Sequence, residues 1–321
     1  MDKKSVLSTS NDRIIGIWYA LAAFTAWGVL PLYWKVLKLI PAGEILAHRV
    51  LWSFIFVSVI LFLYGRWNNV KEIISGKYNV FVIFLGALLI SANWFIYIWA
   101  VNTNHVVEAS LGYYINPLFN VILGMVVLRE QLNFWQLISL LLAFSGVVII
   151  AAQYGKIPWI ALSLALSFGL YGLVKKLVNI DSIVGLALET AFVAPVALVY
   201  LILIQAKGTG SFGAVPISII FLLICSGIVT ALPLLWFAQG AKRVPLSTVG
   251  FIQYLSPSIS LLLGVFIFKE PFTKINFLSF GFIWLALALY SSSQTNIMYN
   301  LQPTYFKTIT TMDNCINKHV R

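Results

Sequence analysis

Ten apolar segments, each long enough to cross a bilayer, occupy most of this chain. A transmembrane helix needs roughly 20 predominantly apolar residues to span about 30 Å of hydrocarbon. Hydrophobic residues make up 60% of the 321 positions and charged residues 10%, so a soluble domain could not shield this much apolar surface from water. The sequence therefore predicts an all-α polytopic membrane protein with ten transmembrane helices, at residues 14–34, 44–64, 80–101, 107–128, 132–151, 158–175, 183–204, 216–237, 247–268 and 275–292.

Little of the chain lies outside these spans. The first span follows residues 1–13 directly and lacks a small-residue cleavage site, so we expect a retained helix preceded by a short cytoplasmic N-tail. Residues 293–321 form a polar, weakly basic cytoplasmic tail without apolar periodicity, which we expect to be disordered or loosely attached. Any activity must therefore reside in the helical bundle or at its mouths.

The basic residues are distributed unevenly between the two sides of the membrane. The net charge of +11 does not indicate a nucleic-acid partner, because the basic residues are scattered through short loops. With the N-terminus inside, 14 of the 21 Lys and Arg residues fall in inside segments and six in outside segments, and Arg49 lies within a span. The positive-inside rule then predicts a multi-pass protein of the cytoplasmic (inner) membrane with both termini in the cytoplasm.

The chain repeats itself with an offset of about 140 residues. Pro117 matches Pro257, Gly124 matches Gly264, and the pair Arg129-Glu130 matches Lys269-Glu270. Each copy holds five spans, an odd number, so the second copy must lie upside down relative to the first. We expect a first five-helix repeat at residues 14–151 and a second, inverted repeat at 152–292. Inverted repeats of this kind build secondary transporters, whose sites lie near the midplane between the halves.

Several polar-containing blocks resemble one known family. The blocks are PAGEILAHRVLWS at 41–53, NWFIYIWAVN at 93–102, VEASLGYYINP at 107–117, LPLLWF at 232–237 and PLSTVGFIQY at 245–254. They are similar to RarD-type members of the EamA family, in the drug/metabolite transporter superfamily. The resemblance covers about residues 14–292. It implies ten helices, two EamA repeats and a permease for small metabolites or drugs, with a link to chloramphenicol resistance.

Polar side chains beside the two matched prolines indicate a central cavity. Proline within a span frees a backbone carbonyl, which is tolerated where protein or a water-filled cavity satisfies it. The expected substrate-binding residues are Asn93, Trp94, Tyr97, Tyr113, Asn116, Asn120, Gln253, Tyr254 and Ser256, with Pro117 and Pro257 as gating residues. The alternative is that the amides and hydroxyls join helices by hydrogen bonds. The aromatic residues favour flat or amphipathic organic solutes.

Four ionisable residues inside the spans are candidates for coupling or gating, because ionisable groups at depth are costly. Glu189 lies about 9 Å into its span at 1.5 Å per residue. It is expected to be either a proton-binding carboxylate or the structural partner of a neighbouring helix. Arg49 occupies the repeat-equivalent position, where it flanks a polar path or snorkels to the interface. Glu44 and His48 share one helix face, and His48 is either protonated during transport or structural.

These features favour a secondary transporter over other classes. There is no Walker A motif, so ATP cannot drive it, and we expect no cofactor and no metal. No span carries an Asp and no hydrolase motif occurs, so we do not expect an enzyme. An uncoupled facilitator, a channel or a lipid scramblase remains the alternative. The expected partners are a small-molecule substrate, the lipid bilayer and protons as coupling ion, and we expect a monomer.

Overall fold

The computed structural model describes the backbone of residues 3–103, 105–178, 180–269, 273–293 and 295–303, and all regular structure within them is helical. Ten segments are long and apolar enough to cross a membrane, as the sequence predicts. Helices form because hydrocarbon offers no hydrogen-bond partner, so each spanning segment must satisfy its own backbone groups. The helices are α1 (Lys3–Val36), α2 (Ala42–Leu63), α3 (Trp67–Ser75), α4 (Lys77–Asn102), α5 (Val106–Val126), α6 (Phe134–Tyr154), α7 (Trp159–Leu177), α8 (Ser182–Ala206), α9 (Ile217–Arg243), α10 (Leu246–Gln253), α11 (Leu255–Phe266), α12 (Lys274–Ser292) and α13 (Asn296–Leu301).

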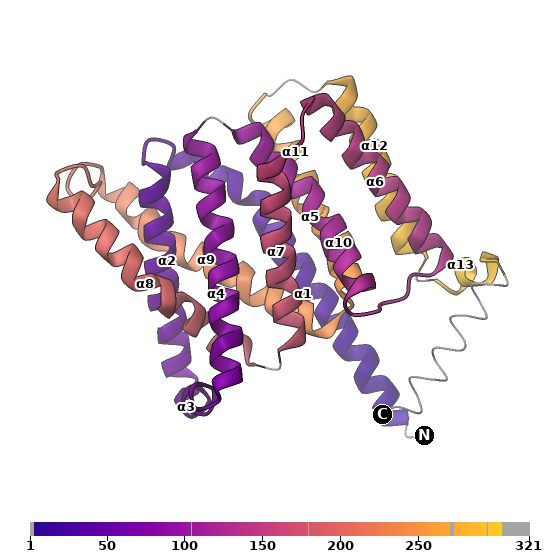
Figure 1. The fold of residues 1–321 in the computed structure, drawn as a ribbon, viewed down its shortest axis with the longest axis horizontal. Helices are drawn as coiled ribbons and strands as arrows, with labels where there is room; N and C mark the ends of the chain where they lie inside the picture. The colour runs from indigo at the N-terminus through magenta and orange to yellow at the C-terminus, as the bar shows by residue number, and fades with distance from the viewer. Residues whose placement is uncertain (1–2, 104, 179, 270–272, 294, 304–321) are drawn as a thin grey trace.

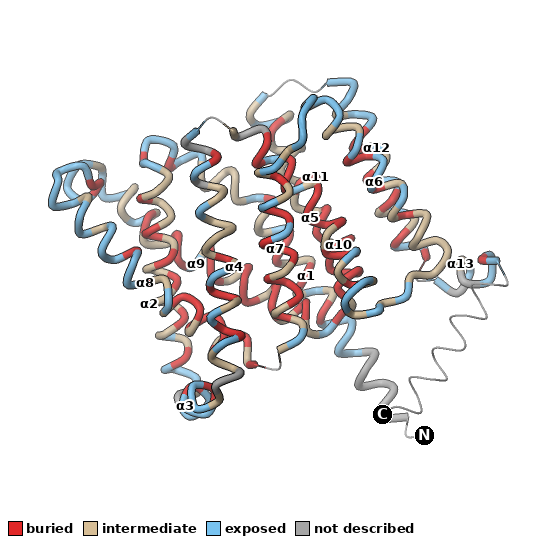
Figure 2. The backbone as a smooth tube through the Cα atoms, in the orientation of Figure 1, coloured by how far each residue is buried: buried red, intermediate tan, exposed pale blue. Residues whose placement is uncertain are grey.

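The helices form one bundle with a middle group and two outer flanks (Figure 1). Helix α5 packs against α7 and α10, and α1 packs against α9 and α11, which places these helices in the middle. Helices α6 and α12 pair on one flank, while α2 and α8 pair on the other, with α9 against α2. Buried positions gather on the middle helices and exposed positions on the outer faces (Figure 2). Those outer faces are rich in exposed apolar side chains, which suits contact with lipid.

The ninth span is broken into two helices. Helix α10 ends at Gln253 and α11 begins at Leu255, so the break lies at Tyr254. Pro257 favours a break here without requiring one, because proline has no N–H and its ring clashes with the carbonyl four residues earlier, that of Gln253. Helix α5 carries Pro117 at the matching position and continues without a break. The two proline-bearing spans therefore differ locally although their sequences match.

Helices α5 and α11 end in the same way. Arg129 and Lys269 have φ of 53° and 58°, and they are the only described residues other than glycine with a positive φ. The hydrogen bonds before these two residues are also the same. The N–H groups of residues 127 and 128 donate to the Leu123 carbonyl, and those of residues 267 and 268 donate to the Leu263 carbonyl. A non-glycine residue in the left-handed region costs free energy, so its use at two positions 140 residues apart is informative.

Three features differ from the sequence expectation. Helix α1 begins at Lys3, within the expected N-tail, and the connection after α2 contains the short helix α3. The tail begins with α13, where the Trp135 indole N–H donates to the Met298 carbonyl at 2.9 Å. The start of the tail is thus attached to α6, and the expectation for residues 304–321 lies outside the described residues.

Candidate functional site

The two matched proline-bearing spans cross at the centre of the bundle. Gly250 of α10 lies so close to α5 that an added Cβ would stand 2.6 Å from the Pro117 carbonyl oxygen. At this crossing the Asn120 side-chain amide donates to Gln253 Oε1 at 2.5 Å, and both residues are buried. One amide from each half of the chain therefore meets beside the prolines.

Some polar atoms at the crossing have no hydrogen-bond partner within the described residues. They are Asn116 Oδ1 and Asn120 Oδ1, both in buried side chains. The buried Tyr254 hydroxyl also has no partner among those residues, but its side chain packs with residues of α5, α6, α7 and α12. Buried polar groups are nearly always paired, so each exception needs an explanation, and a bound solute or water is one. The crossing thus offers acceptors that the bundle itself does not use.

Asn93 and Ser256 lie apart from that crossing. The Asn93 amide donates to the Leu164 carbonyl at 2.9 Å and to Ser167 Oγ at 3.0 Å, so it joins α4 to α7. This is the packing role that the sequence left open for it. Ser256 is partly buried, and its carbonyl lies close to Gly28 of α1.

Arg49 lies between helices in an aromatic environment. Its guanidinium carbon stands 4.8 Å from the Trp34 ring centroid and 5.5 Å from that of Trp94, and Nε donates to Thr230 Oγ1 at 3.0 Å. These partners come from α1, α4 and α9, so the side chain points between the helices and does not snorkel to an interface. The phenols of Tyr97 and Tyr113 complete the group, with their ring centroids 6.2 Å apart.

Glu189 forms a second cluster, separate from Arg49. Lys175 Nζ donates to Glu189 Oε1 at 2.6 Å, and the Tyr171 hydroxyl donates to Oε2 at 3.2 Å. All three side chains are buried. A cavity of about 20 Å³ adjoins the pair, between α4, α7, α8 and α9, which is enough for one water molecule. Arg49 and Glu189 each have their own partners and do not meet.

Further polar contacts close the end of the bundle where Glu189 lies. Arg66 forms an ion pair with Asp181, which also caps α8 by accepting from the Ile183 N–H. The Glu130 carboxylate accepts from the N–H groups of Leu246 at 2.6 Å and Ser247 at 2.8 Å. A carboxylate is favourable at a helix N-terminus because the unpaired N–H groups there carry partial positive charge. The Arg66–Asp181 pair and the two Glu130 bonds join the first half of the chain to the second.

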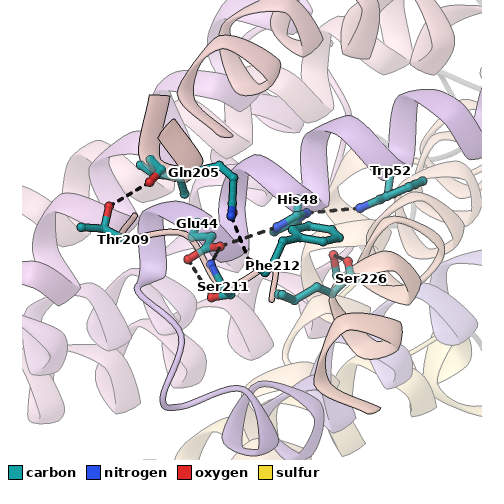
Figure 3. A network of polar contacts seen from close by, with 10 residues as sticks. Glu44, His48, Trp52, Gln205, Thr209, Ser211, Phe212 and Ser226 are labelled. Carbon is teal, nitrogen blue, oxygen red and sulfur yellow. Dashed lines mark hydrogen bonds and ion pairs between the residues drawn. The ribbon is translucent and has the colours of Figure 1, made fainter. Parts of the chain in front are cut away.

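Glu44 and His48 belong to a network at the opposite end of the bundle (Figure 3). The Glu44 carboxylate accepts from the Ser211 N–H at 2.7 Å and from its hydroxyl at 2.9 Å, which fastens the α8–α9 connection to α2. The Trp52 indole donates to His48 Nδ1 at 3.2 Å, so His48 carries its proton on Nε2, which faces Glu44 at 3.9 Å. These contacts hold the α8–α9 connection against α2, which is a structural role.

Sequence reasoning missed several members of these clusters. It did not single out Lys175, the last residue of the expected span 158–175, which the structure places in the last turn of α7 against Glu189. Trp34, Thr230 and Tyr171 gave no signal, because apolar and hydroxyl residues are common in spans. A lone carboxylate at depth does require a partner, so a search for nearby basic residues would have found Lys175 and Lys176, of which only Lys175 bonds to Glu189.

A ten-span helical bundle with buried polar clusters between its halves defines a polytopic membrane protein of the transporter type. The model of the EamA-like transporter family matches residues 14–152 and 156–292. The chain belongs to this family.

Similar proteins carry transporter names. The uncharacterized transporter YojE of Bacillus subtilis (strain 168) is 49% identical over 87% of this chain and 94% of its own length. Protein RarD of Escherichia coli (strain K12) is 43% identical over 86% of this chain and 93% of its own. The chloramphenicol-sensitive protein RarD of Pseudomonas aeruginosa is 26% identical over 85% of this chain and 92% of its own length. A crystal structure covering 87% of this chain, with a TM-score of 0.67 and 20% identity, shares the fold.

Proposed function

We propose that the protein is a secondary transporter that moves a small organic solute across the cytoplasmic membrane through the centre of the bundle. The observation that carries this is the crossing of α5 and α10. There, Asn120 and Gln253 from opposite halves are bonded beside two prolines, and Asn116 keeps an unused acceptor. Solutes bind at such crossings in inverted-repeat transporters, because both halves contact the solute and can alternate around it.

The two halves are inverted repeats in this proposal. The helix contacts support this proposal. The contact of α5 with α7 in one half corresponds to that of α11 with α1, and the contact of α4 with α7 corresponds to that of α9 with α1. The pairs α6 with α12, α2 with α8 and α5 with α10 each join a helix to its counterpart in the other half. The matching left-handed residues Arg129 and Lys269 support it independently.

We propose that the structure represents a state open towards the outside. With cytoplasmic termini, the Glu189 cluster lies in the inner half and Arg49 in the outer half. Glu189 is 3% exposed and Tyr171 0%, whereas Tyr113 beside Arg49 is 49% exposed. Contacts across the halves hold the inner end, including the Arg66–Asp181 pair and the Glu130 bonds to α10. The Glu44–Ser211 bonds join the halves at the outer end as well, so the proposal depends on the difference in exposure. Opening inwards then requires these contacts to break.

Glu189 is the coupling residue in this scheme. Protonation of its carboxylate would cancel the attraction to Lys175 at 2.6 Å and free the inner end, which links proton movement to the change of state. Export is the proposed direction, and chloramphenicol or a similar amphipathic solute is a candidate cargo, because one relative's name refers to that drug. We propose that a monomer suffices, since both halves of the site come from one chain.

An untargeted comparison of metabolites inside and outside cells, with and without overexpression, tests this function. A transporter shifts the distribution of a restricted set of solutes, and a variant lacking the Asn116 acceptor loses the shift. Uncoupled flow through a facilitator, channel or scramblase would persist without a proton gradient in proteoliposomes. If overexpression redistributes no solute, or if flux ignores an imposed pH gradient, coupled transport is wrong.

A further inference from the structure

Arg49 is a partly buried cation without a carboxylate partner among the described residues. Glu189 is paired with Lys175, Asp181 with Arg66, and Glu44 with Ser211 and His48. No ion pair involves Arg49 within the described part of the chain. A guanidinium between helices without a counter-ion is costly, and such residues mark substrate or ion pathways.

The geometry leaves one edge of the guanidinium free. Trp34 and Trp94 lie at 4.8 and 5.5 Å from its carbon, in the range of cation–π contacts. The bond from Nε to Thr230 is the one hydrogen bond that this side chain makes among the described residues. The four N–H groups of the two terminal nitrogens remain. Two of them, side by side, match the two oxygens of a carboxylate.

The surroundings suit a flat, apolar body attached to that carboxylate. Tyr97 and Tyr113 lie beside Arg49, and Tyr113 is 49% exposed although it belongs to a helix of the middle of the bundle. Trp34, Trp94, Tyr97 and Arg49 itself are all partly exposed. These side chains are therefore not sealed inside the core, and stacking on aromatic faces favours planar groups.

We propose that Arg49 is the carboxylate-binding residue of the transport site, and that the substrate is a monoanionic organic acid with a flat apolar body. This inference rests on the proposed transport function and assigns the cargo a negative charge, so it departs from chloramphenicol, which is neutral. A single cation balances a single negative charge. A dianion such as a phosphomonoester would keep an uncompensated charge in the site and bind more weakly.

Binding to the purified full-length protein tests the charge class. The probes are benzoate, cinnamate and indole-3-acetate, each compared with its uncharged amide, together with phenyl phosphate as a dianion. We expect the carboxylates to raise the melting temperature with half-saturation at least tenfold below that of the amides and of phenyl phosphate. Equal effects of acids and amides, or no effect of any acid, would overturn the inference.

Two variants separate the guanidinium from other cations. Arg49→Gln should abolish the preference for acids, and Arg49→Lys should weaken it, because lysine keeps the charge but lacks the two-pronged donor. Arg243→Gln is the matched control, since Arg243 is exposed and bonds to Gln239. Retention of the acid preference in Arg49→Gln would refute the assignment.

A measurement on the unaltered protein covers the case in which the Arg49 variants do not fold. Phenylglyoxal modifies arginine side chains, and mass spectrometry locates the modified residue. Benzoate should protect Arg49 at least fivefold, while benzamide should not, and Arg243 should react equally in both. Failure of benzoate to protect Arg49 overturns the anion site. If overexpression then redistributes neutral or cationic solutes, the proposed transport function is retained and only the anion site is wrong.

Discussion

Glu189 and Lys175 form the buried ion pair on which the coupling proposal depends. Glu189→Gln keeps the shape of the side chain but cannot exchange a proton, so gradient-driven accumulation should be lost while downhill exchange of substrate continues. Uptake into proteoliposomes with and without a pH gradient measures both. If the Gln variant concentrates substrate as well as the unaltered protein, the carboxylate is structural and coupling belongs elsewhere.

Stability measurements on the same pair provide a control. Removing one partner of a buried ion pair leaves an uncompensated charge and costs about 3–5 kcal/mol. We therefore expect Glu189→Gln and Lys175→Met each to lower the melting temperature, and the double variant to recover most of the loss. Additive losses in the double variant would mean that the two side chains do not interact as the structure has them.

Asn116 separates a binding role from a packing role. Its Oδ1 has no hydrogen-bond partner among the described residues, so Asn116→Ala should reduce transport strongly while leaving thermal stability nearly unchanged. Gln253→Ala also removes the acceptor of Asn120, so it should reduce transport and cost about 1–3 kcal/mol of stability. Flux and melting curves on both variants check this. Loss of stability in Asn116→Ala would identify it as packing.

Helix α2 approaches α9 closely at Gly227. A Cβ built there would stand 2.3 Å from the carbonyl carbon of Trp52, and the Ser53 hydroxyl donates to the Gly227 carbonyl at 2.9 Å. Gly227→Ala should therefore push the helices apart and cost about 1–3 kcal/mol. Gly281→Ala is the control, because nothing lies within 4 Å of its added Cβ. Similar melting temperatures for both variants would contradict the packing of α2 on α9.

The N-terminus of α10 is held by a side chain from the other half of the chain. Glu130→Ala removes the acceptor of two backbone N–H groups and should cost about 1–2 kcal/mol, as the loss of a helix cap does. Glu72→Ala in α3 removes an exposed carboxylate and should change little. Thermal unfolding in detergent compares them. An unchanged melting temperature for Glu130→Ala would show that the contact between the halves is dispensable.

The whole molecule should have both termini in the cytoplasm. The even number of spans places both termini on one side, and the excess of basic residues on that side predicts that it is the cytoplasmic one. A reporter active only in the cytoplasm should be active when fused after Gln294. The same reporter fused after Gly208, in the α8–α9 connection, should be inactive. The reverse pattern would overturn the orientation and exchange the inner and outer ends of the proposed cycle.

The sequence by itself determined the class, the number of spans and the family resemblance. Those properties depend on apolar length and local composition, which can be read along the chain because a helix in lipid satisfies its backbone internally. The matched prolines and the depth of Glu189 also follow from position alone. Local rules predicted that α5 and the ninth span would be alike, and they did not predict that only the latter breaks at Tyr254.

The tertiary structure alone decided which polar groups meet. Lys175 reaches back from the end of α7 to Glu189, and Asn93 bonds to α7, while Arg49 lies between two indoles from α1 and α4. Such partners come from different helices, so their distances depend on how the helices rotate and cross. Helix rotation is set by the packing of small residues such as Gly227 and Gly250 over the whole interface, and no single segment of sequence contains that information.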